Sequence, residues 1–233
     1  MKTLAILGYH KIGNPPGGWQ TWNYVSEKIF ESHLQYLKNN EWQVIDVKQF
    51  LAGVEMPATL PEKAALITFD DGYRSNLHIA LPILKKFSYP AIVFLPTGFV
   101  GGYNAFDADI FYEPKEDICT WEELMELEKN NVSIQSHSVT HRHFSTMSIA
   151  EQIEEVNKSK QLIETNLKKN VDLFSFPYGD DGKDHLQTGK ILANANYKAA
   201  FLYGGPAVEL PLLSKYRLTR VPVGADSELI LED

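Results

Sequence analysis

The stretch Ala-Leu-Ile-Thr-Phe-Asp-Asp-Gly (residues 65–72) joins a short apolar run to two adjacent carboxylates, Asp70 and Asp71. The apolar run predicts a buried strand, and Asp-Asp-Gly is typical of the turn that follows one. In parallel α/β folds, ligands bind and catalysis takes place at the carboxyl ends of the strands. The pair is therefore either an ordinary acidic turn or a functional pair, in which one carboxylate binds a metal ion and the other acts as a general base.

Strand-like and helix-like segments alternate along the rest of the chain. Apolar runs predict strands at about 4–9, 43–47, 65–69, 91–95, 132–136, 172–176, 198–202 and 217–221. Amphipathic spacing predicts helices at about 27–38, 75–87, 121–130 and 148–169. The last two begin with capping boxes, Thr120 with Glu123 and Ser148 with Glu151. This alternation predicts an α/β fold with mainly parallel strands, arranged as a barrel in a single domain over residues 1–233.

Composition excludes several classes of function. The 44% hydrophobic and 22% charged fractions are ordinary for a globular protein, and a net charge of -8 argues against an extended nucleic-acid surface. The only cysteine, Cys119, rules out an internal disulfide and a cysteine-based zinc cage, and we expect it in the core. No apolar run reaches the roughly 20 residues that cross a bilayer. The N-terminal run has no cleavage site, so we expect a cytoplasmic protein, or an exported one if a signal has been trimmed away.

Two histidines four residues apart, His137 and His141, follow the predicted strand at 132–136. If the backbone turns helically there, both imidazoles face the same way and can bind one metal ion. His-x-x-x-His alone is a weak pattern, but the carboxylate pair stands at the end of another strand. Two histidines and an aspartate leave coordination positions open for water and substrate, which is typical of catalytic metal sites. His143 is expected to point elsewhere, and His33, His78 and His185 have no partner motif.

A third strand ends in turn residues, Phe176-Pro177-Tyr178-Gly179. The backbone N–H of Tyr178 is a candidate donor to a developing oxyanion, whereas Pro177 has no N–H to offer. Two long loops, 11–24 and 96–119, are also candidates for a functional role. The first carries Trp19, Trp22 and Tyr24, whose rings either stack on sugars or pack the loop onto the body of the protein.

The three motifs resemble those of the polysaccharide deacetylase family, also called the NodB-homology domain or carbohydrate esterase family 4. They are Thr68–Gly72, His137–His141 and Phe176–Gly179, and they occur in the family's order over most of the chain. The resemblance implies a distorted (β/α)7 barrel that removes acetyl groups, typically from N-acetylated sugars. It also implies one divalent metal ion, with Zn²⁺ suited to a His2Asp set and Co²⁺ or Ni²⁺ able to fit similar sites.

Carried over by position, the resemblance assigns a role to each motif residue. Asp70 is the general base, Asp71, His137 and His141 bind the metal, and Tyr178 supplies the oxyanion donor. The chain departs from the family pattern at Ser175, where an arginine that orients the base is usual, and it lacks the late Leu-x-His motif that supplies the general acid.

The resemblance to the branch of circularly permuted poly-N-acetylglucosamine deacetylases accounts for the second departure. In that branch an early Tyr-His takes the role of the general acid. Here Tyr9-His10 ends the first strand, so the resemblance assigns the role of general acid to His10. Arg220 is a candidate to replace the arginine absent at Ser175.

The predicted function is therefore a metal-dependent hydrolase acting on carbon–nitrogen bonds other than peptide bonds. Its partner is a carbohydrate substrate. Two alternatives stay open: an esterase or amidase with the same catalytic residues and another acyl substrate, and a carbohydrate-binding relative without activity. The sequence does not distinguish the sugar, the chain length of the substrate, the metal or the oligomeric state.

Overall fold

The computed structural model describes residues 2–19, 21–111, 113–225 and 227–231. Its elements run in the order β1 (Thr3–Tyr9), β2 (Lys11–Ile12), β3 (Tyr24–Val25), α1 (Glu27–Asn39), β4 (Gln43–Val44), α2 (Val47–Glu55), β5 (Lys63–Asp70), α3 (Leu81–Phe87), β6 (Ala91–Leu95), α4 (Ala105–Ala108), α5 (Trp121–Lys129), β7 (Val132–Ser136), α6 (Ile149–Leu167), β8 (Leu173–Ser175), α7 (His185–Asn194), β9 (Ala199–Phe201), β10 (Val208–Glu209) and β11 (Val221–Pro222). No helix in these ranges is long and apolar enough to cross a membrane.

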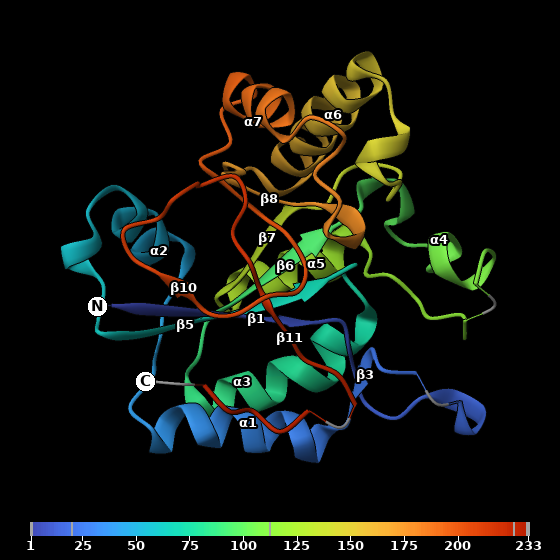
Figure 1. The fold of residues 1–233 in the computed structure, drawn as a ribbon. Coiled ribbons are helices and arrows are strands. Elements are labelled where there is room, and N and C mark those ends of the chain that lie inside the picture. Colours follow the sequence, from blue (N-terminus) through green and yellow to red (C-terminus); the bar gives the residue numbers. More distant parts are fainter. Residues whose placement is uncertain (1, 20, 112, 226, 232–233) are drawn as a thin grey trace.

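A curled sheet forms the centre of the molecule (Figure 1). Its strands follow the order β10-β1-β5-β6-β7-β8-β9, and all the pairings except that of β10 with β1 are parallel. The predicted distorted barrel of mainly parallel strands is confirmed. Helices surround the sheet, with α1 and α3 on one side and α6 and α7 on the opposite side.

The C-terminal segment bridges the open edge between β9 and β1. Leu218 pairs with Phe201 of β9, and β11 pairs in parallel with Leu7 and Gly8 of β1. The sequence predicts a full strand at 217–221, but only Val221–Pro222 is a strand, because the segment changes partner at this point. This crossing places Arg220 between the two edges of the sheet.

Alternating side chains divide the core into an inner and an outer layer. Inside the curl lie Leu4 and Ile6 of β1 with Leu66 of β5 and Phe201 of β9, and Phe50 of α2 packs onto this cluster. The intervening residues of the same strands pack outward against the surrounding helices. Because strand side chains alternate in direction, residues that continue the inner set must emerge inside the curl at the carboxyl ends.

Most predicted elements are confirmed, including the strands 91–95 and 132–136 with their full bounds and both capping boxes. The strand expected at 43–47 is wrong beyond Val44, because Asp46 and Gln49 form a capping box that starts α2. The helix expected at 75–87 begins with a π-helical stretch, Asn76–Ala80, beside Pro82, which has no N–H to donate. Cys119 is buried, as expected of a core residue.

Candidate active site

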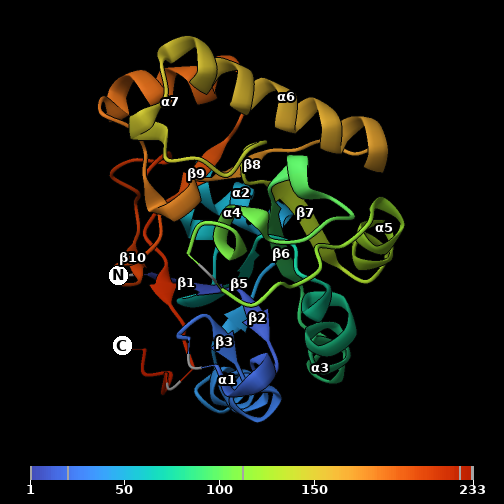
Figure 2. The same cartoon turned by 90° about the vertical axis from the view of Figure 1, so that its right-hand side faces the viewer.

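The candidate site lies where the parallel strands end (Figure 2). Thr68 and Asp70 continue the inner register of β5, which begins with Ala64 and Leu66. On β1 the same register passes through Gly8 to His10, just past the end of the strand. The fold therefore brings the predicted base and the predicted acid to one side of the sheet, and Nε2 of His10 lies 4.0 Å from Oδ2 of Asp70.

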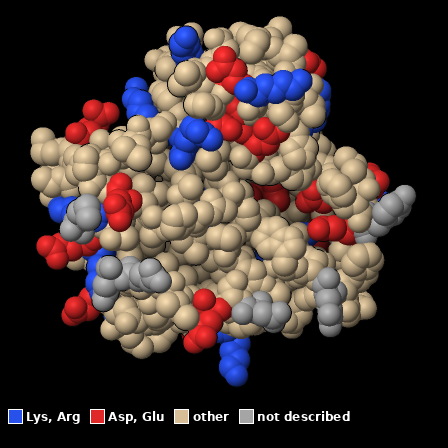
Figure 3. All heavy atoms as spheres, viewed as in Figure 1, with Lys and Arg blue, Asp and Glu red and all other residues tan. Residues whose placement is uncertain are grey.

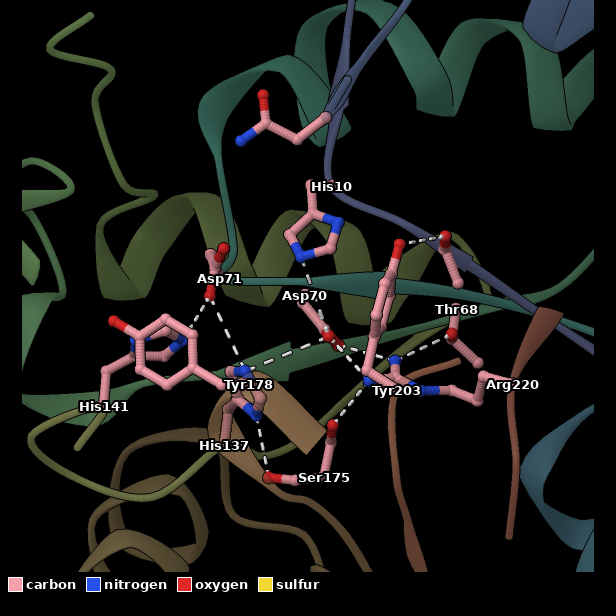
Figure 4. Close-up of polar contacts among 12 residues, drawn as sticks. His10, Thr68, Asp70, Asp71, His137, His141, Ser175, Tyr178, Tyr203 and Arg220 are labelled. Atoms are coloured by element: carbon pink, nitrogen blue, oxygen red, sulfur yellow. Dashed lines mark hydrogen bonds and ion pairs between the residues drawn. The ribbon is translucent and has the colours of Figure 1, made fainter. Parts of the chain in front are cut away.

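Asp71, His137 and His141 form a buried group that could hold a metal ion (Figure 4). One ligand atom from each residue lies within 4.8 Å of the others. Nε2 of His137 lies 3.7 Å and Nε2 of His141 lies 3.2 Å from Oδ1 of Asp71. The structure thus assembles the three predicted metal ligands in one place.

The protonation of His137 fits a metal ligand. Its Nδ1 donates to the backbone carbonyl of Ser175 at 2.7 Å, which places the proton on Nδ1 because a carbonyl can only accept. Burial lowers the pKa of His137 to about 4, so the ring is neutral and its Nε2 carries a lone pair. That lone pair faces a buried Asp71 oxygen that accepts no hydrogen bond from the described residues. Two electron-rich atoms facing each other favour a cation between them.

The loop that carries the histidines is not helical, contrary to the expectation that a helical turn aligns the two rings. Instead Ser138 and His141 adopt left-handed backbone conformations, with φ of 67° and 54°. Buried Glu155 of α6 accepts hydrogen bonds from the backbone N–H groups of Val139 and Thr140 at 2.7 and 2.9 Å. These contacts bring the imidazole centroids to 4.9 Å from each other.

Arg220 occupies the position beside Asp70 that the sequence leaves open. Its two terminal nitrogens donate to Oδ1 and Oδ2 of Asp70 at 2.7 and 2.6 Å. The remaining N–H groups donate to Leu202 O, Thr68 Oγ1 and Ser175 Oγ. Burial acts to raise the pKa of Asp70, but the charge of Arg220 and its hydrogen bonds act against burial, and this pKa lies below its usual value. Asp70 is therefore a buried, ionised carboxylate with fixed orientation.

His10 is held between aromatic rings. Its ring centroid lies 5.3 Å from that of Trp22 and 5.1 Å from that of Tyr203, and its carbonyl accepts from Asn76 Nδ2 at 2.9 Å. Burial lowers the pKa of His10 more than Asp71 and Asp70 raise it. The imidazole is thus positioned next to the base with a pKa below that of a free histidine.

Tyr178 lies on the other side of the group, with its ring centroid 4.7 Å from that of His141. Its backbone is left-handed, with φ of 58°, which is unusual for a residue with a side chain and is often found at functional sites. The role of its N–H as an oxyanion donor stays a prediction. His143, expected to point elsewhere, is half exposed and stacks on Tyr178 with centroids 4.1 Å apart.

A cavity of about 330 Å³ opens over these residues. It is also lined by residues that the sequence did not single out, namely Asp107, Phe111, Glu113, Tyr203 and Asn23. Burial, and then the charge of Asp71, raise the pKa of Asp107 to about 7. The first three residues belong to the predicted functional loop 96–119, and Tyr203 continues the inner register of β9. The length of this loop was the only signal in the sequence for its three residues, and no signal pointed to Tyr203.

Comparisons with known proteins identify the family of the chain. The family model for polysaccharide deacetylases matches residues 58–200. A poly-beta-1,6-N-acetyl-D-glucosamine N-deacetylase of Staphylococcus aureus is 31% identical over 216 residues, covering 88% of this chain and 70% of that protein. YxkH of Bacillus subtilis is 27% identical over 80% of this chain, which spans only 61% of YxkH.

A solved structure shows the same fold. The deacetylase PplD of Streptococcus pyogenes, in complex with acetate, superposes with a TM-score of 0.82 at 21% identity over 96% of this chain and 93% of that one. The family match and the staphylococcal relative carry the assignment of family. The chain belongs to the polysaccharide deacetylase family, whose members are hydrolases of carbon–nitrogen bonds other than peptide bonds.

Proposed function

We propose that the chain is a metal-dependent N-deacetylase that removes acetyl groups from N-acetylglucosamine units of a glycan. The observation that carries this proposal is the juxtaposition of a fixed, ionised Asp70 with the Asp71, His137 and His141 group on one side and His10 on the other. The staphylococcal relative acts on poly-beta-1,6-N-acetyl-D-glucosamine, which makes this polymer the first substrate to test.

Asp71, His137 and His141 are the residues that would hold the metal ion. A divalent ion in such a site supplies a Lewis acid, which polarises a carbonyl and lowers the pKa of water from about 16 toward 7. The face-to-face arrangement of the His137 lone pair and the unpartnered Asp71 oxygen supports this role. Zn²⁺ suits two imidazoles and one carboxylate, and Co²⁺ and Ni²⁺ are the next candidates.

Asp70 takes a proton from the attacking water. Its Oδ2 accepts from Arg220 and also faces the cavity, 3.9 Å from His137 Nε2 and 4.0 Å from His10 Nε2. A carboxylate oxygen has two lone pairs, so it can keep the arginine contact while it accepts a proton. His10, on the far side of Oδ2, donates a proton from its imidazolium form to the departing amine, which is a poor leaving group as an anion, and becomes neutral imidazole. The charges of Asp71 and Asp70 are the influences that favour the imidazolium form. The backbone N–H of Tyr178 is the proposed donor to the oxyanion.

Acetate release tests this proposal. The purified protein, stripped of metal and reloaded with Zn²⁺, Co²⁺ or Ni²⁺, is assayed on β-1,6-linked N-acetylglucosamine oligomers, on acetylated xylan and on small N-acetyl amides. We expect metal-dependent acetate release from the oligomers and none from the Asp70→Asn variant. Preferential release from xylan would favour the esterase alternative, preferential release from the small amides would favour the amidase alternative, and no release from any substrate would favour a binding protein.

A further inference from the structure

Tyr178 is held in an unusual backbone conformation. It lies between Pro177 and Gly179 with φ of 58° and ψ of 11°, and a residue with a side chain keeps such angles only where its surroundings enforce them. The N–H of Gly179 donates to the Phe176 carbonyl at 2.9 Å, which closes a turn around Tyr178. The proposed reaction depends on the direction of the Tyr178 N–H, so the contacts that hold this residue affect the chemistry.

The side chain of Tyr178 contacts two histidine rings. The ring of His141, a proposed metal ligand, meets it edge-on, with centroids 4.7 Å apart and planes at 68° (Figure 4). The ring of His143 stacks on it face to face, with centroids 4.1 Å apart and planes at 16°. The Tyr178 hydroxyl donates to Oδ1 of Asp107 at 3.4 Å, which is long for a hydrogen bond. The histidine rings therefore restrain the tyrosine ring more closely than its hydroxyl contact does.

Asp180 holds His143 beside Tyr178. Its Oδ2 lies 3.3 Å from Nδ1 of His143 and accepts from the backbone N–H and the hydroxyl of Ser145 at 3.0 and 2.5 Å. Its Oδ1 accepts from the N–H of Gly182 at 3.0 Å. One carboxylate thus ties the loop after β7, which carries His143, to the segment after β8, which carries Tyr178.

His143 stands outside the groups that react. It is not among the described residues that line the catalytic cavity, nor among the three that could hold the metal ion. With 48% of its side chain exposed, it also contributes little to the core. Tyr178, in contrast, lines the cavity. An effect of His143 on the reaction that leaves the metal in place therefore passes through Tyr178.

We propose that His143 is a positioning residue for the oxyanion donor. Its ring, held by Asp180, stacks on Tyr178 and keeps the backbone N–H of that residue directed at the oxyanion. This inference rests on the proposed function and deepens it, because it adds a residue that controls the rate without contacting the substrate. A donor aligned before the charge develops needs no reorganisation during the reaction. The oxyanion forms only in the transition state, so loss of this alignment lowers kcat and leaves KM unchanged.

The first test removes the stack with His143→Ala in the Zn²⁺-loaded enzyme, assayed on β-1,6-linked N-acetylglucosamine oligomers. Removal of a whole oxyanion donor costs about 10²–10³ in kcat, so misalignment of one should lower kcat by a smaller factor, roughly five- to twentyfold. KM and bound metal should equal those of the wild type. The melting temperature should change little, because the side chain is half exposed.

Two further variants show whether the flat ring is what matters. His143→Phe keeps a ring that can stack on Tyr178 and should recover most of the lost kcat. His78→Ala is the matched control, because His78 is another exposed histidine near a carboxylate, 3.8 Å from Glu123, and is not among the described lining residues of the catalytic cavity. It should retain the wild-type kcat.

Removal of the tyrosine ring shows whether His143 acts through it. In a Tyr178→Ala background the stack is already absent, so adding His143→Ala should cause no further fall in kcat. A full additional fall would assign the effect to another contact of His143 and overturn the proposal. Wild-type kcat in His143→Ala would also overturn it, as would a kcat in His143→Phe as low as in His143→Ala.

The mobility of the Tyr178 amide provides a readout that does not need turnover. Protein labelled with ¹⁵N-tyrosine carries 11 labelled amides, and Tyr178→Phe identifies the signal of residue 178 by its loss. In His143→Ala the order parameter of this amide should fall from about 0.85 to below about 0.6, and His143→Phe should restore it. An unchanged order parameter in His143→Ala would overturn the positioning role even if acetate is released. A wild type that releases no acetate, with the amide still dependent on His143, would instead overturn the proposed function and retain the positioning of Tyr178.

Discussion

Arg220 grips Asp70 through two parallel hydrogen bonds of 2.7 and 2.6 Å, although the two residues are 150 positions apart in the chain. Both side chains are buried, and all five N–H groups of the guanidinium have acceptors. The bidentate geometry fixes both the orientation and the ionisation of the carboxylate. In the view of Figure 3, lysine and arginine side chains are scattered over the surface among acidic ones. Arg220, in contrast, is fully buried and holds the Asp70 carboxylate.

Replacement of Arg220 by Gln should shift the pH dependence of turnover. Arg220 is the strongest influence that lowers the pKa of Asp70, so its loss raises that pKa. Activity falls when the base becomes protonated, and the acidic limb of kcat/KM should therefore move to higher pH by about 1–3 units. A buried charge without its partner also costs about 3–5 kcal/mol of unfolding free energy, so thermal unfolding must be followed in parallel. A folded variant with an unmoved acidic limb would contradict the role assigned to Arg220.

Replacement of Gly8 by Ala should displace side chains of the candidate active site, because Gly8 faces the inside of the barrel. A Cβ at Gly8 would lie 2.9 Å from Cε2 of the Tyr203 ring and 3.7 Å from Cβ of Arg220. Overpacking of this kind costs about 1–3 kcal/mol, and here it displaces residues beside His10 and Asp70. We expect a lower kcat together with a lower melting temperature. Gly189→Ala on α7 is the control, because its Cβ would meet only an ordinary contact of 3.6 Å with Tyr216.

Measurement of bound metal should distinguish the proposed roles of the adjacent carboxylates Asp70 and Asp71. Asp71→Ala and His137→Ala remove proposed ligands, so metal bound after dialysis should fall at least about tenfold as measured by mass spectrometry. Asp70→Asn should retain the metal and lose turnover. His143→Ala is the matched histidine control, since His143 stacks on Tyr178 outside the ligand group. Wild-type metal content in a His137→Ala/His141→Ala double variant would refute the proposed site.

The buried, neutral ring of His33 should make the folded protein less stable in mild acid. Its Nε2 lies 2.7 Å from the Ser227 carbonyl, which only accepts, so Nδ1 accepts from the Tyr9 hydroxyl at 3.1 Å and the ring is neutral. Burial lowers the pKa of His33, so the unfolded chain binds more protons below about pH 6.5 and stability falls as pH falls. In urea titrations at pH 7 and pH 5, His33→Gln should lose less stability between the two than wild type does. An equal loss in both proteins would assign the acid sensitivity to other groups.

The sequence predicts those elements that depend on interactions between residues close together in the chain. The strands 91–95 and 132–136 and the capping boxes at Thr120 and Ser148 follow from residues that are neighbours in the chain. The clustering of Asp71 with His137 followed from the rule that parallel strands end at one edge. Function at the level of family is confirmed by the comparisons.

Contacts between distant segments were harder to predict. The path of the chain around His141 depends on Glu155 of α6, which lies further along the chain. Asp107 of α4 and Glu113 line the cavity from the segment 96–119, whose course has no periodic pattern in the sequence. Arg220 was proposed only as a replacement for a missing arginine, and its contact with Asp70 depends on a short segment that changes strand partner. The roles of the site residues and the cytoplasmic location stay predictions.

The bridging segment at the open edge of the sheet also imposes an order on the biogenesis of the enzyme. Residues 58–200, which the family model covers, contain Asp70, Asp71 and both histidines, but His10 precedes this region and Arg220 follows it. During synthesis the three proposed metal ligands therefore leave the ribosome before the arginine does. Asp70 acquires its partner only when the last strand docks on the first, so the proposed ligand group is present in the nascent chain before the carboxylate beside it is fixed.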